Sequence, residues 1–327
     1  MQFKKLIWPI IHKWRKLIYP IRMKQYEQKI YNNYSLKGIN SLERRLVCME
    51  DSNFSHGGLV DRMKGIISGY FLAEKYRLSF SVYFSDANDP MIPYLNPKVV
   101  DIITEESKVN FNKDNSRPVV WYNHFPNNPA LMKQRILSKR EIHLYCNMNL
   151  LQVFSDSEIA MKQAWSEAFS QIFLMHEQPI GNTMGIHLRF IGLLGDFKDL
   201  RNYDLDHEHK IGMIEWCENK ILEIGMKNPE YLLKIVSDSS SFLAELLTKE
   251  KFASLRHRLQ VDSSNIGHTA LNINDTVFKK TVDDFIGLRS CEKVIQLRYG
   301  KMHRSDFSRY AAISGLKEYE LIEYNVD

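Results

Sequence analysis

The stretch Gly185-Ile186-His187-Leu188-Arg189-Phe190 is the most informative part of this 327-residue chain. Together with Met184, its apolar residues alternate with smaller or polar ones, which is typical of a β-strand. His187 and Arg189 then fall on one face at the carboxyl end of that strand, where open α/β sheets bind their ligands. An arginine there suits a diphosphate, because its planar guanidinium bonds two oxygens at once and stays charged. The alternative explanation is an arginine in a surface ion pair.

The rest of the second half alternates strands with helices. Apolar runs predict strands at 184–189, 231–237, 258–261, 293–297 and 320–322, and helical spacing predicts helices at 211–226, 242–249, 275–290 and 306–315. Strands separated by helices imply a largely parallel sheet with helices on both faces. We therefore expect residues 181–327 to form one Rossmann-like domain.

The first half shows the same alternation. A strand at 46–49, a loop at 52–58, a helix at 61–76 and a strand at 78–84 predict a βαβ unit. Further strands are expected at 99–103, 119–122 and 142–146, with a long helix at 157–176. Residues 41–180 should form a second Rossmann-like domain, which gives an α/β chain of two domains with a cleft between them.

Composition identifies an ordinary globular protein. Hydrophobic residues make up 44% and charged residues 25% of the chain. The four cysteines, Cys48, Cys146, Cys217 and Cys291, lie far apart without zinc-like spacing, which favours reduced thiols and a cytoplasmic location.

Positive charge is concentrated at the N-terminus. Residues 1–30 hold eight Lys/Arg and one Glu, which gives this segment a net charge of +7. The whole chain has a net charge of +5, so the remaining residues together carry a charge of about −2. The excess is not spread over the body, which argues against nucleic-acid binding. Trp8, Trp14 and other apolar residues alternate with the basic ones, and Pro9 and Pro20 divide the segment. We expect residues 1–40 to be a basic amphipathic, membrane-proximal segment whose residues 1–30 bind an anionic membrane surface; packing on the body or on a second subunit is the alternative.

Three segments that follow expected strands and open helices point to phosphates and sugars. The first is a glycine loop, in which Gly57 and Gly58 permit a close backbone approach to a ligand. The second is a strand end followed by hydroxyl residues, and the third is a hydroxyl-rich helix start; simple helix capping could explain both. In chain order the segments are His56-Gly57-Gly58-Leu59-Val60-Asp61-Arg62, Ser237-Asp238-Ser239-Ser240-Ser241 and Arg304-Ser305-Asp306-Phe307-Ser308-Arg309.

These segments, in this order, resemble motifs of the GDP-fucose-dependent fucosyltransferases, especially the nodulation and core α-1,6-fucosyltransferase group. That group has an early Gly-Gly-Leu-x-Asp-Arg-type loop, a His-x-Arg strand end, a strand that ends in Ser/Thr-Asp, and a late Ser-x-Phe-Ser-Arg-x-Ala-Ala helix. The corresponding residues here are Gly57–Arg62, His187–Arg189, Ser237-Asp238 and Ser305–Ala312. The acidic residue that often follows His-x-Arg corresponds to Asp196 or Asp199.

The resemblance implies a GT-B fold, with the acceptor mainly in the first domain and the donor nucleotide in the second. It also implies inverting sugar transfer without a metal or another cofactor. Its site residues carry over as catalytic Arg189, His187 and Asp196, as substrate-binding His56, Gly57, Gly58, Asp61 and Arg62, and as nucleotide-binding Ser237, Asp238, Ser305, Phe307, Ser308 and Arg309.

A metal-dependent alternative rests on Asp204-Leu205-Asp206, which is formally a DxD motif followed by His207 and His209. Its surroundings are polar and no apolar strand precedes it, which favours a solvated loop.

The sequence therefore predicts a cytoplasmic glycosyltransferase, peripheral on the inner face of the membrane. We expect it to move fucose or a related sugar from a GDP-sugar to a glycan or lipid-linked acceptor in surface-polysaccharide assembly. A sulfotransferase would also need basic strand ends and helix N-termini. The non-enzymatic alternative is a catalytically inactive transferase-fold adaptor at the membrane.

Overall fold

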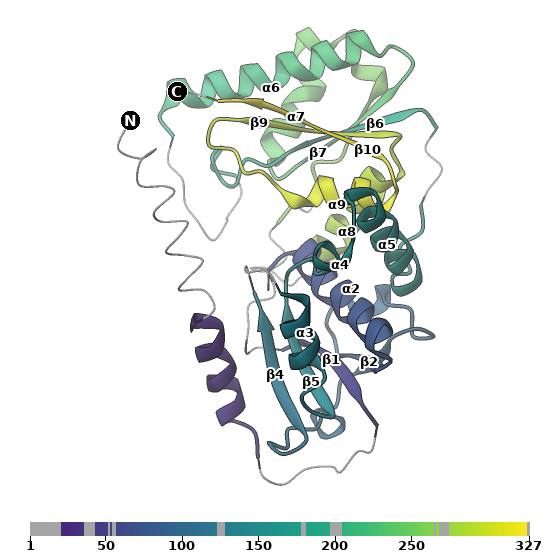
Figure 1. The fold of residues 1–327 in the computed structure, drawn as a ribbon. Coiled ribbons are helices and arrows are strands. Elements are labelled where there is room, and N and C mark those ends of the chain that lie inside the picture. The colour runs from purple at the N-terminus through teal and green to yellow at the C-terminus, as the bar shows by residue number, and fades with distance from the viewer. Residues whose placement is uncertain are drawn as a thin grey trace. The chain divides into compact units, whose positions relative to one another are not determined.

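The computed structural model of the protein describes residues 21–35, 43–51, 53, 57–122, 128–177, 181–196, 205–264, 266–267 and 275–325. The chain divides into two compact units (Figure 1). Unit 1 comprises Met1–Gly57 and Asp61–Met161, and unit 2 comprises Gly58–Val60 and Lys162–Asp327. This boundary lies closer to the N-terminus than the residue 180 expected from the sequence, but each sheet lies wholly on one side of both positions.

Unit 1 is built on a five-stranded parallel sheet with the order β3-β2-β1-β5-β4. The strands are β1 (Arg45–Glu50), β2 (Ser79–Phe84), β3 (Asp101–Ile103), β4 (Ser116–Trp121) and β5 (Glu141–Cys146). Its helices are α2 (Leu59–Tyr76), α3 (Pro129–Ile136) and α4 (Leu151–Phe154), with short 3-10 turns at Ile92–Tyr94 and Glu106–Lys108. The sequence pattern predicts all five strands and α2, whereas it misses α3 and α4, which are only eight and four residues long.

The helix formed by residues 21–32 belongs to unit 1. Met23, Ile30 and Tyr34 are buried in one cluster with residues of the sheet, among them Val47 and Tyr145. Glu27 accepts a hydrogen bond from the backbone N–H of Val120, at 2.8 Å, on the edge strand β4, and it pairs with Arg135. The apolar face of residues 21–32 is therefore used in the core, so this part of the expected membrane-proximal segment packs on the body. Residues 1–20 lie outside the described residues.

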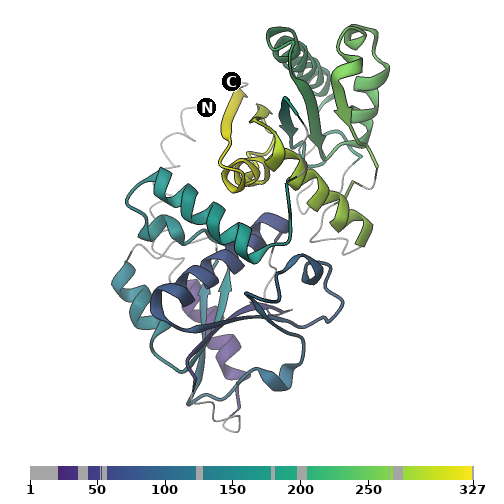
Figure 2. The ribbon, with the colours of Figure 1, turned by 90° about the vertical axis from the view of Figure 1, so that its right-hand side faces the viewer.

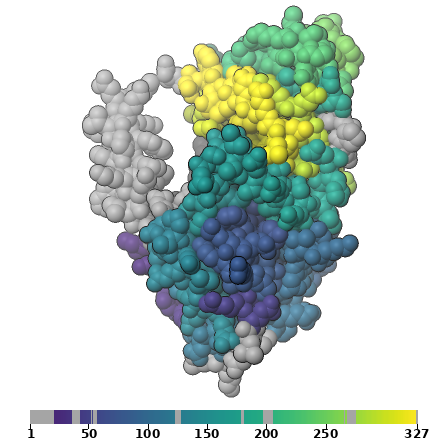
Figure 3. Space-filling model, turned by 45° about the vertical axis from the view of Figure 1, so that its right-hand side comes forward, coloured from purple at the N-terminus to yellow at the C-terminus, as the bar shows by residue number. Residues whose placement is uncertain are grey.

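Unit 2 contains a second five-stranded parallel sheet, with the order β10-β9-β6-β7-β8. The strands are β6 (Thr183–Leu188), β7 (Leu232–Ser237), β8 (Leu259–Val261), β9 (Lys293–Tyr299) and β10 (Glu318–Tyr324). The helices are α5 (Glu158–Ile172), α6 (His207–Lys227), α7 (Ser240–Thr248), α8 (Asp275–Ser290) and α9 (Asp306–Ser314), with 3-10 turns at Glu250–Phe252 and Arg256–Arg258. The C-terminal strand β10 is an edge strand, and Figure 3 shows the yellow C-terminal residues at the surface of this unit.

The two faces of the second sheet are covered by different helices (Figure 2). Ile186 and Leu188 share a core cluster with residues of α6 and α7. Gly185 points to the other face, toward α8, where a Cβ atom would lie only 2.7 Å from Leu288 Cδ2. His187 has the same parity as Gly185, so the strand directs it toward the side of α8 and α9.

The boundary between the units falls inside α5. The Trp165 indole donates a hydrogen bond to Ser314 Oγ at 2.9 Å, and its ring packs edge-on against Tyr310. These contacts explain why the second part of α5 belongs to unit 2.

Candidate functional site

The candidate site lies at the carboxyl edge of the unit 2 sheet. The chain runs from the central strand β6 to β7 and β8 on one side, and later to β9 and β10 on the other. The order of the strands therefore reverses between β6 and β9, and ligands of open α/β sheets bind at such a switch point. The His-x-Arg segment, the Ser-Asp strand end and the start of α9 all lie at this edge, as the sequence predicts.

Arg189 and Asp238 meet just beyond the ends of β6 and β7. Arg189 NH1 lies 3.4 Å from Asp238 Oδ2, and the arginine side chain is 21% exposed. The buried Asp238 also accepts hydrogen bonds from the backbone N–H groups of Phe190 and Ile191, at 2.7 and 2.8 Å. Burial raises the pKa of the Asp238 carboxyl, while Arg189 and these N–H groups oppose that rise. Asp238 thus fixes the turn that carries Arg189.

His187 is buried and contacts α9. Its Nδ1 atom lies 3.0 Å from Ser308 Oγ, and its ring lies 5.6 Å from the ring of Phe307. Burial, followed by the positive charges of Arg189 and His303, lowers the pKa of His187 to about 3. The imidazole is therefore neutral at physiological pH, and it shares one hydrogen bond with the Ser308 hydroxyl through Nδ1. In the tautomer in which that hydroxyl donates to Nδ1, the other nitrogen, Nε2, carries the hydrogen.

The N-terminus of α9 completes this edge. Ser305 caps the helix by accepting a hydrogen bond from the backbone N–H of Phe307 at 3.2 Å. Ser308 is fully buried against His187, whereas Phe307 and Arg309 are half-buried. Ser305 is thus a helix cap, as the alternative interpretation expected, and the nucleotide-binding role of this segment stays a prediction.

Asp196 lies at the N-terminus of α7. Its Oδ2 atom accepts hydrogen bonds from the Ser239 and Ser241 hydroxyls and from the Ser241 N–H, at 2.8, 2.7 and 2.9 Å. Burial would raise the pKa of Asp196, but the bonds from Ser241 and Ser239 outweigh it and the pKa lies below its ordinary value. The carboxylate thus ties the loop after β6 to α7. Its catalytic role stays a prediction, and Asp199 lies outside the described residues.

The glycine-loop residues of unit 1 have different surroundings. Gly57 has a φ of +75°, a conformation that favours glycine. Asp61 pairs with Lys64, and Arg62 forms ion pairs with Glu50 and Asp89. Gly58 groups with unit 2 in the division of the chain, and His56 lies outside the described residues. The ligand-binding roles of these residues remain predictions.

Sequence reasoning overlooked some residues at both edges. The backbone N–H of His303 donates to the carbonyl oxygen of Arg189 at 3.0 Å. The positive charge of the His303 side chain contributes to the lowered pKa of His187. Its position shortly after β9 was the available signal. Glu50 and Asp89, the partners of Arg62, gave no comparable signal because they lie 12 and 27 residues away from it in the sequence.

The formal DxD motif provides a helix cap. Asp206 is the N-cap of α6 and accepts a hydrogen bond from the backbone N–H of His209 at 3.0 Å. Asp204 lies outside the described residues. Within the part of the chain that the structure describes, no group of three or more His, Cys, Asp or Glu side chains could hold a metal ion.

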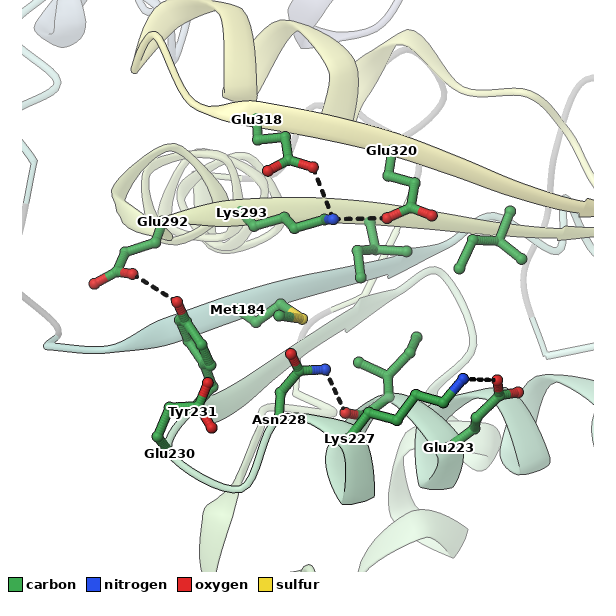
Figure 4. Close-up of a pocket in the computed structure, with 13 residues that line it drawn as sticks. Met184, Glu223, Lys227, Asn228, Glu230, Tyr231, Glu292, Lys293, Glu318 and Glu320 are labelled. Carbon is green, nitrogen blue, oxygen red and sulfur yellow. Dashed lines mark hydrogen bonds and ion pairs between the residues drawn. The ribbon is translucent and has the colours of Figure 1, made fainter.

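A cavity of about 580 Å³ opens at the opposite, amino edge of the unit 2 sheet (Figure 4). Its rim is acidic, and Glu223, Glu292, Glu318 and Glu320 have partners. Lys293 Nζ lies 2.7 Å from Glu318 and 2.8 Å from Glu320, and Tyr231 donates to Glu292 at 3.0 Å. This cavity contains none of the predicted site residues.

The two parallel α/β units, each with a switch point at a carboxyl edge, are consistent with a two-domain fold of the GT-B type. Among solved structures, the chain is similar to a mutant of FUT1 from Arabidopsis thaliana in complex with GDP, with 9% identity over 93% of this chain and 75% of that one and a TM-score of 0.56. The fold is thus of the fucosyltransferase type, which confirms the resemblance that the motifs indicate.

Two further structures are similar at lower TM-scores. NodZ α-1,6-fucosyltransferase soaked with GDP-fucose matches with 13% identity over 83% of this chain and 92% of that one, at a TM-score of 0.46. Fucosyltransferase NodZ from Bradyrhizobium matches with 14% identity over 88% and 96%, at 0.47. No family model and no curated protein sequence matches the chain.

Across the described ranges, no helix combines the length and apolar character that crossing a bilayer requires.

Proposed function

We propose that this protein is an inverting, metal-independent glycosyltransferase. It moves fucose or a related sugar from a GDP-sugar to a glycan or lipid-linked acceptor, in the assembly of a surface polysaccharide. The observation that carries the proposal is the cluster of Arg189, His187 and Ser308 at the carboxyl edge of unit 2. The fucosyltransferase-type fold supports it, and the cluster occupies the carboxyl edge at which open α/β sheets bind ligands.

The chemistry of the reaction requires positive charge at the leaving group. As the acceptor hydroxyl attacks the anomeric carbon, the nucleoside diphosphate departs and negative charge develops on its β-phosphate. Arg189, held by the turn that Asp238 fixes, stabilises this charge more in the transition state than in the ground state. The neutral His187 donates its Nε2 hydrogen to a phosphate oxygen, and Ser308 orients the ring.

The two units divide the work in this proposal. Residues 181–327 hold the donor, through Arg189, His187 and the start of α9, and residues 41–180 hold the acceptor. Ser237, Asp238, Ser305, Phe307 and Arg309 surround the nucleotide. The loop anchored by Asp196 borders the donor site, because it follows Arg189 after β6 and Asp196 bonds to the N-terminus of α7.

A panel of nucleotides in a thermal-shift assay tests the donor. GDP should raise the melting temperature more than UDP or CMP at equal concentration, and at about 100 Kd it contributes roughly 2.7 kcal/mol. Stabilisation by adenosine 3′,5′-bisphosphate instead of GDP would identify a sulfotransferase. No stabilisation by any of the four would identify an inactive adaptor, and stronger stabilisation by UDP would refute the choice of donor.

We also propose that the protein is cytoplasmic and binds the inner, anionic face of a membrane through its N-terminal segment. Residues 1–20 hold five Lys/Arg and no acid, and the exposed face of the helix at 21–32 adds Arg22, Lys24 and Lys29. Met23 and Ile30 are buried in unit 1, so the apolar contacts of membrane binding come from residues 1–20 together with the exposed Ile21 and Tyr26. Co-sedimentation should occur with vesicles that contain phosphatidylglycerol and not with pure phosphatidylcholine, and removal of residues 1–20 should abolish it. Equal binding to both vesicles would refute the electrostatic part of the proposal.

A further inference from the structure

A fully buried glutamine lies in the interior of unit 2. Gln296 is on β9, and its exposed fraction is 0%. It is in register with His187 on the neighbouring strand β6, so both side chains point to the same face of the sheet, the side of α8 and α9. A buried amide destabilises a protein unless its polar groups are hydrogen-bonded, whereas an apolar side chain of the same size has no such requirement. Gln296 therefore needs a partner for each end of its amide.

Both ends of the Gln296 amide are bonded. The Nε2 group donates to the carbonyl oxygen of His303 at 3.3 Å, and Oε1 accepts a hydrogen bond from the Tyr319 hydroxyl at 2.7 Å. Tyr319 comes from the edge strand β10. Because a carbonyl oxygen can only accept, the amide nitrogen must face His303, and the orientation of the amide is fixed.

The backbone of His303 links Gln296 to the turn that carries Arg189. The N–H of His303 donates to the carbonyl oxygen of Arg189 at 3.0 Å, while its own carbonyl oxygen accepts the bond from Gln296. His303 lies in the loop between β9 and α9. One residue of this loop is therefore held on one side by the interior of the sheet and on the other by the strand end at which Arg189 lies.

A second side chain of β9 holds the same loop. Arg298, two residues after Gln296 and on the same face of the strand, donates from Nε to the carbonyl oxygen of Met302 at 2.9 Å and from NH2 to that of Gly300 at 3.2 Å. Side chains of the preceding strand thus bind three carbonyl oxygens of a segment that leads directly to Ser305, the N-cap of α9. A loop fixed in this way can preorganise a binding site.

We infer that Gln296 is a positioning residue of the donor site, which holds Arg189 in place through the backbone of His303. This inference rests on the proposed function. Gln296 acts through its bond to His303, and Tyr319 keeps its amide in the orientation that this bond requires. Because charge on the leaving phosphate develops only as the bond to the sugar breaks, a displaced Arg189 lowers turnover more than it lowers the affinity for GDP.

Hydrolysis of GDP-fucose, in which water replaces the acceptor, tests this role. Gln296→Met keeps the size of the side chain but removes the amide, and it should lower the rate of GDP release about 10-fold or more, since a small displacement of a catalytic group can cost about 10² in rate. GDP should still raise the melting temperature of the variant. Tyr319→Phe should lower the rate in the same direction by a smaller factor. Tyr231→Phe is the matched control, because it removes a tyrosine hydroxyl, bonded to Glu292 at 3.0 Å, from the opposite edge of the same sheet; it should release GDP at the wild-type rate.

A double-mutant cycle with Arg189→Lys separates positioning from a general loss of stability. If Gln296 acts through Arg189, Gln296→Met should slow the Arg189→Lys variant much less than it slows the unmodified protein. Two losses that simply multiply would overturn the inference, and so would a folded Gln296→Met variant that releases GDP at the wild-type rate. If Gln296→Met does not fold, the same cycle with Tyr319→Phe decides, and a wild-type rate of that variant would overturn the inference. If the unmodified protein is not stabilised by GDP or does not release it from GDP-fucose, the proposed function is refuted and the inference with it.

Discussion

Replacement of Arg189 is the most direct test of the donor site. Arg189→Lys keeps the positive charge but loses the planar fork that bonds two oxygens, so at a leaving diphosphate it is not a conservative change. Loss of a preorganised contact to developing charge costs about 2.7–4 kcal/mol, or roughly 10²–10³ in turnover. Arg189→Ala should be at least as damaging.

The structure also bounds the effect of Arg189→Ala on folding. The arginine side chain is 21% exposed, and its ion pair with Asp238 is 3.4 Å long. Asp238 would keep the backbone N–H groups of Phe190 and Ile191 as partners. The substitution therefore weakens the interactions of one buried group and should lower the free energy of unfolding by about 1–3 kcal/mol. A typical domain has a total stability of about 5–15 kcal/mol. The variant should remain folded.

Release of GDP from GDP-fucose, measured beside a melting curve, separates these effects. Arg256→Ala is the matched control, because Arg256 is exposed in the same unit and its hydrogen bond to the Lys249 carbonyl is 3.4 Å long. Unfolding of Arg189→Ala would show that the arginine serves the fold through its ion pair. A folded Arg189→Ala variant with normal turnover would refute the site.

Three further predictions follow from the contacts described. EDTA should leave turnover unchanged, and Asp206→Ala should lower stability by about 0.5–2 kcal/mol through loss of a helix cap while keeping activity; activity lost on chelation and restored by Mn²⁺ would contradict this. Glu27→Ala should lower the free energy of unfolding in urea by about 1–3 kcal/mol, because the buried Val120 N–H loses its acceptor. Gln28→Ala, on the exposed face of the same helix, should lower it little, and equal losses would contradict the packing of this helix. Because the pKa of His187 is lowered to about 3, the unfolded chain binds a proton below pH 6.5 that the folded chain does not bind. The free energy of unfolding should therefore fall as the pH drops from about 6.5 toward 3, by up to about 1.4 kcal/mol per pH unit. Urea unfolding of His187→Gln should show a flatter pH dependence, and an unchanged slope would exclude His187 as its source.

The elements of the fold are readable from local sequence patterns, and the site only in part. Helix α8 begins and ends where its spacing predicts, at Asp275 and Ser290. The position of Arg189 at a strand end follows from the alternation along β6. The sequence did not reveal that Arg62 forms ion pairs with Glu50 and Asp89, because its motif is equally compatible with a ligand-binding arginine.

The sequence by itself determined the strands and most of the longer helices, because burial imposes a period of two or 3.6 residues that is visible within a short window. Only the tertiary structure decided how polar side chains are used. His187 and Ser308 are 121 residues apart, and Glu27 and Arg135 are 108 apart. A buried polar group must find a partner, but its chemistry does not state which distant residue that partner is. The fold brought Ser308 to His187, and it buried the apolar face of the basic helix at 21–32 in the core of unit 1.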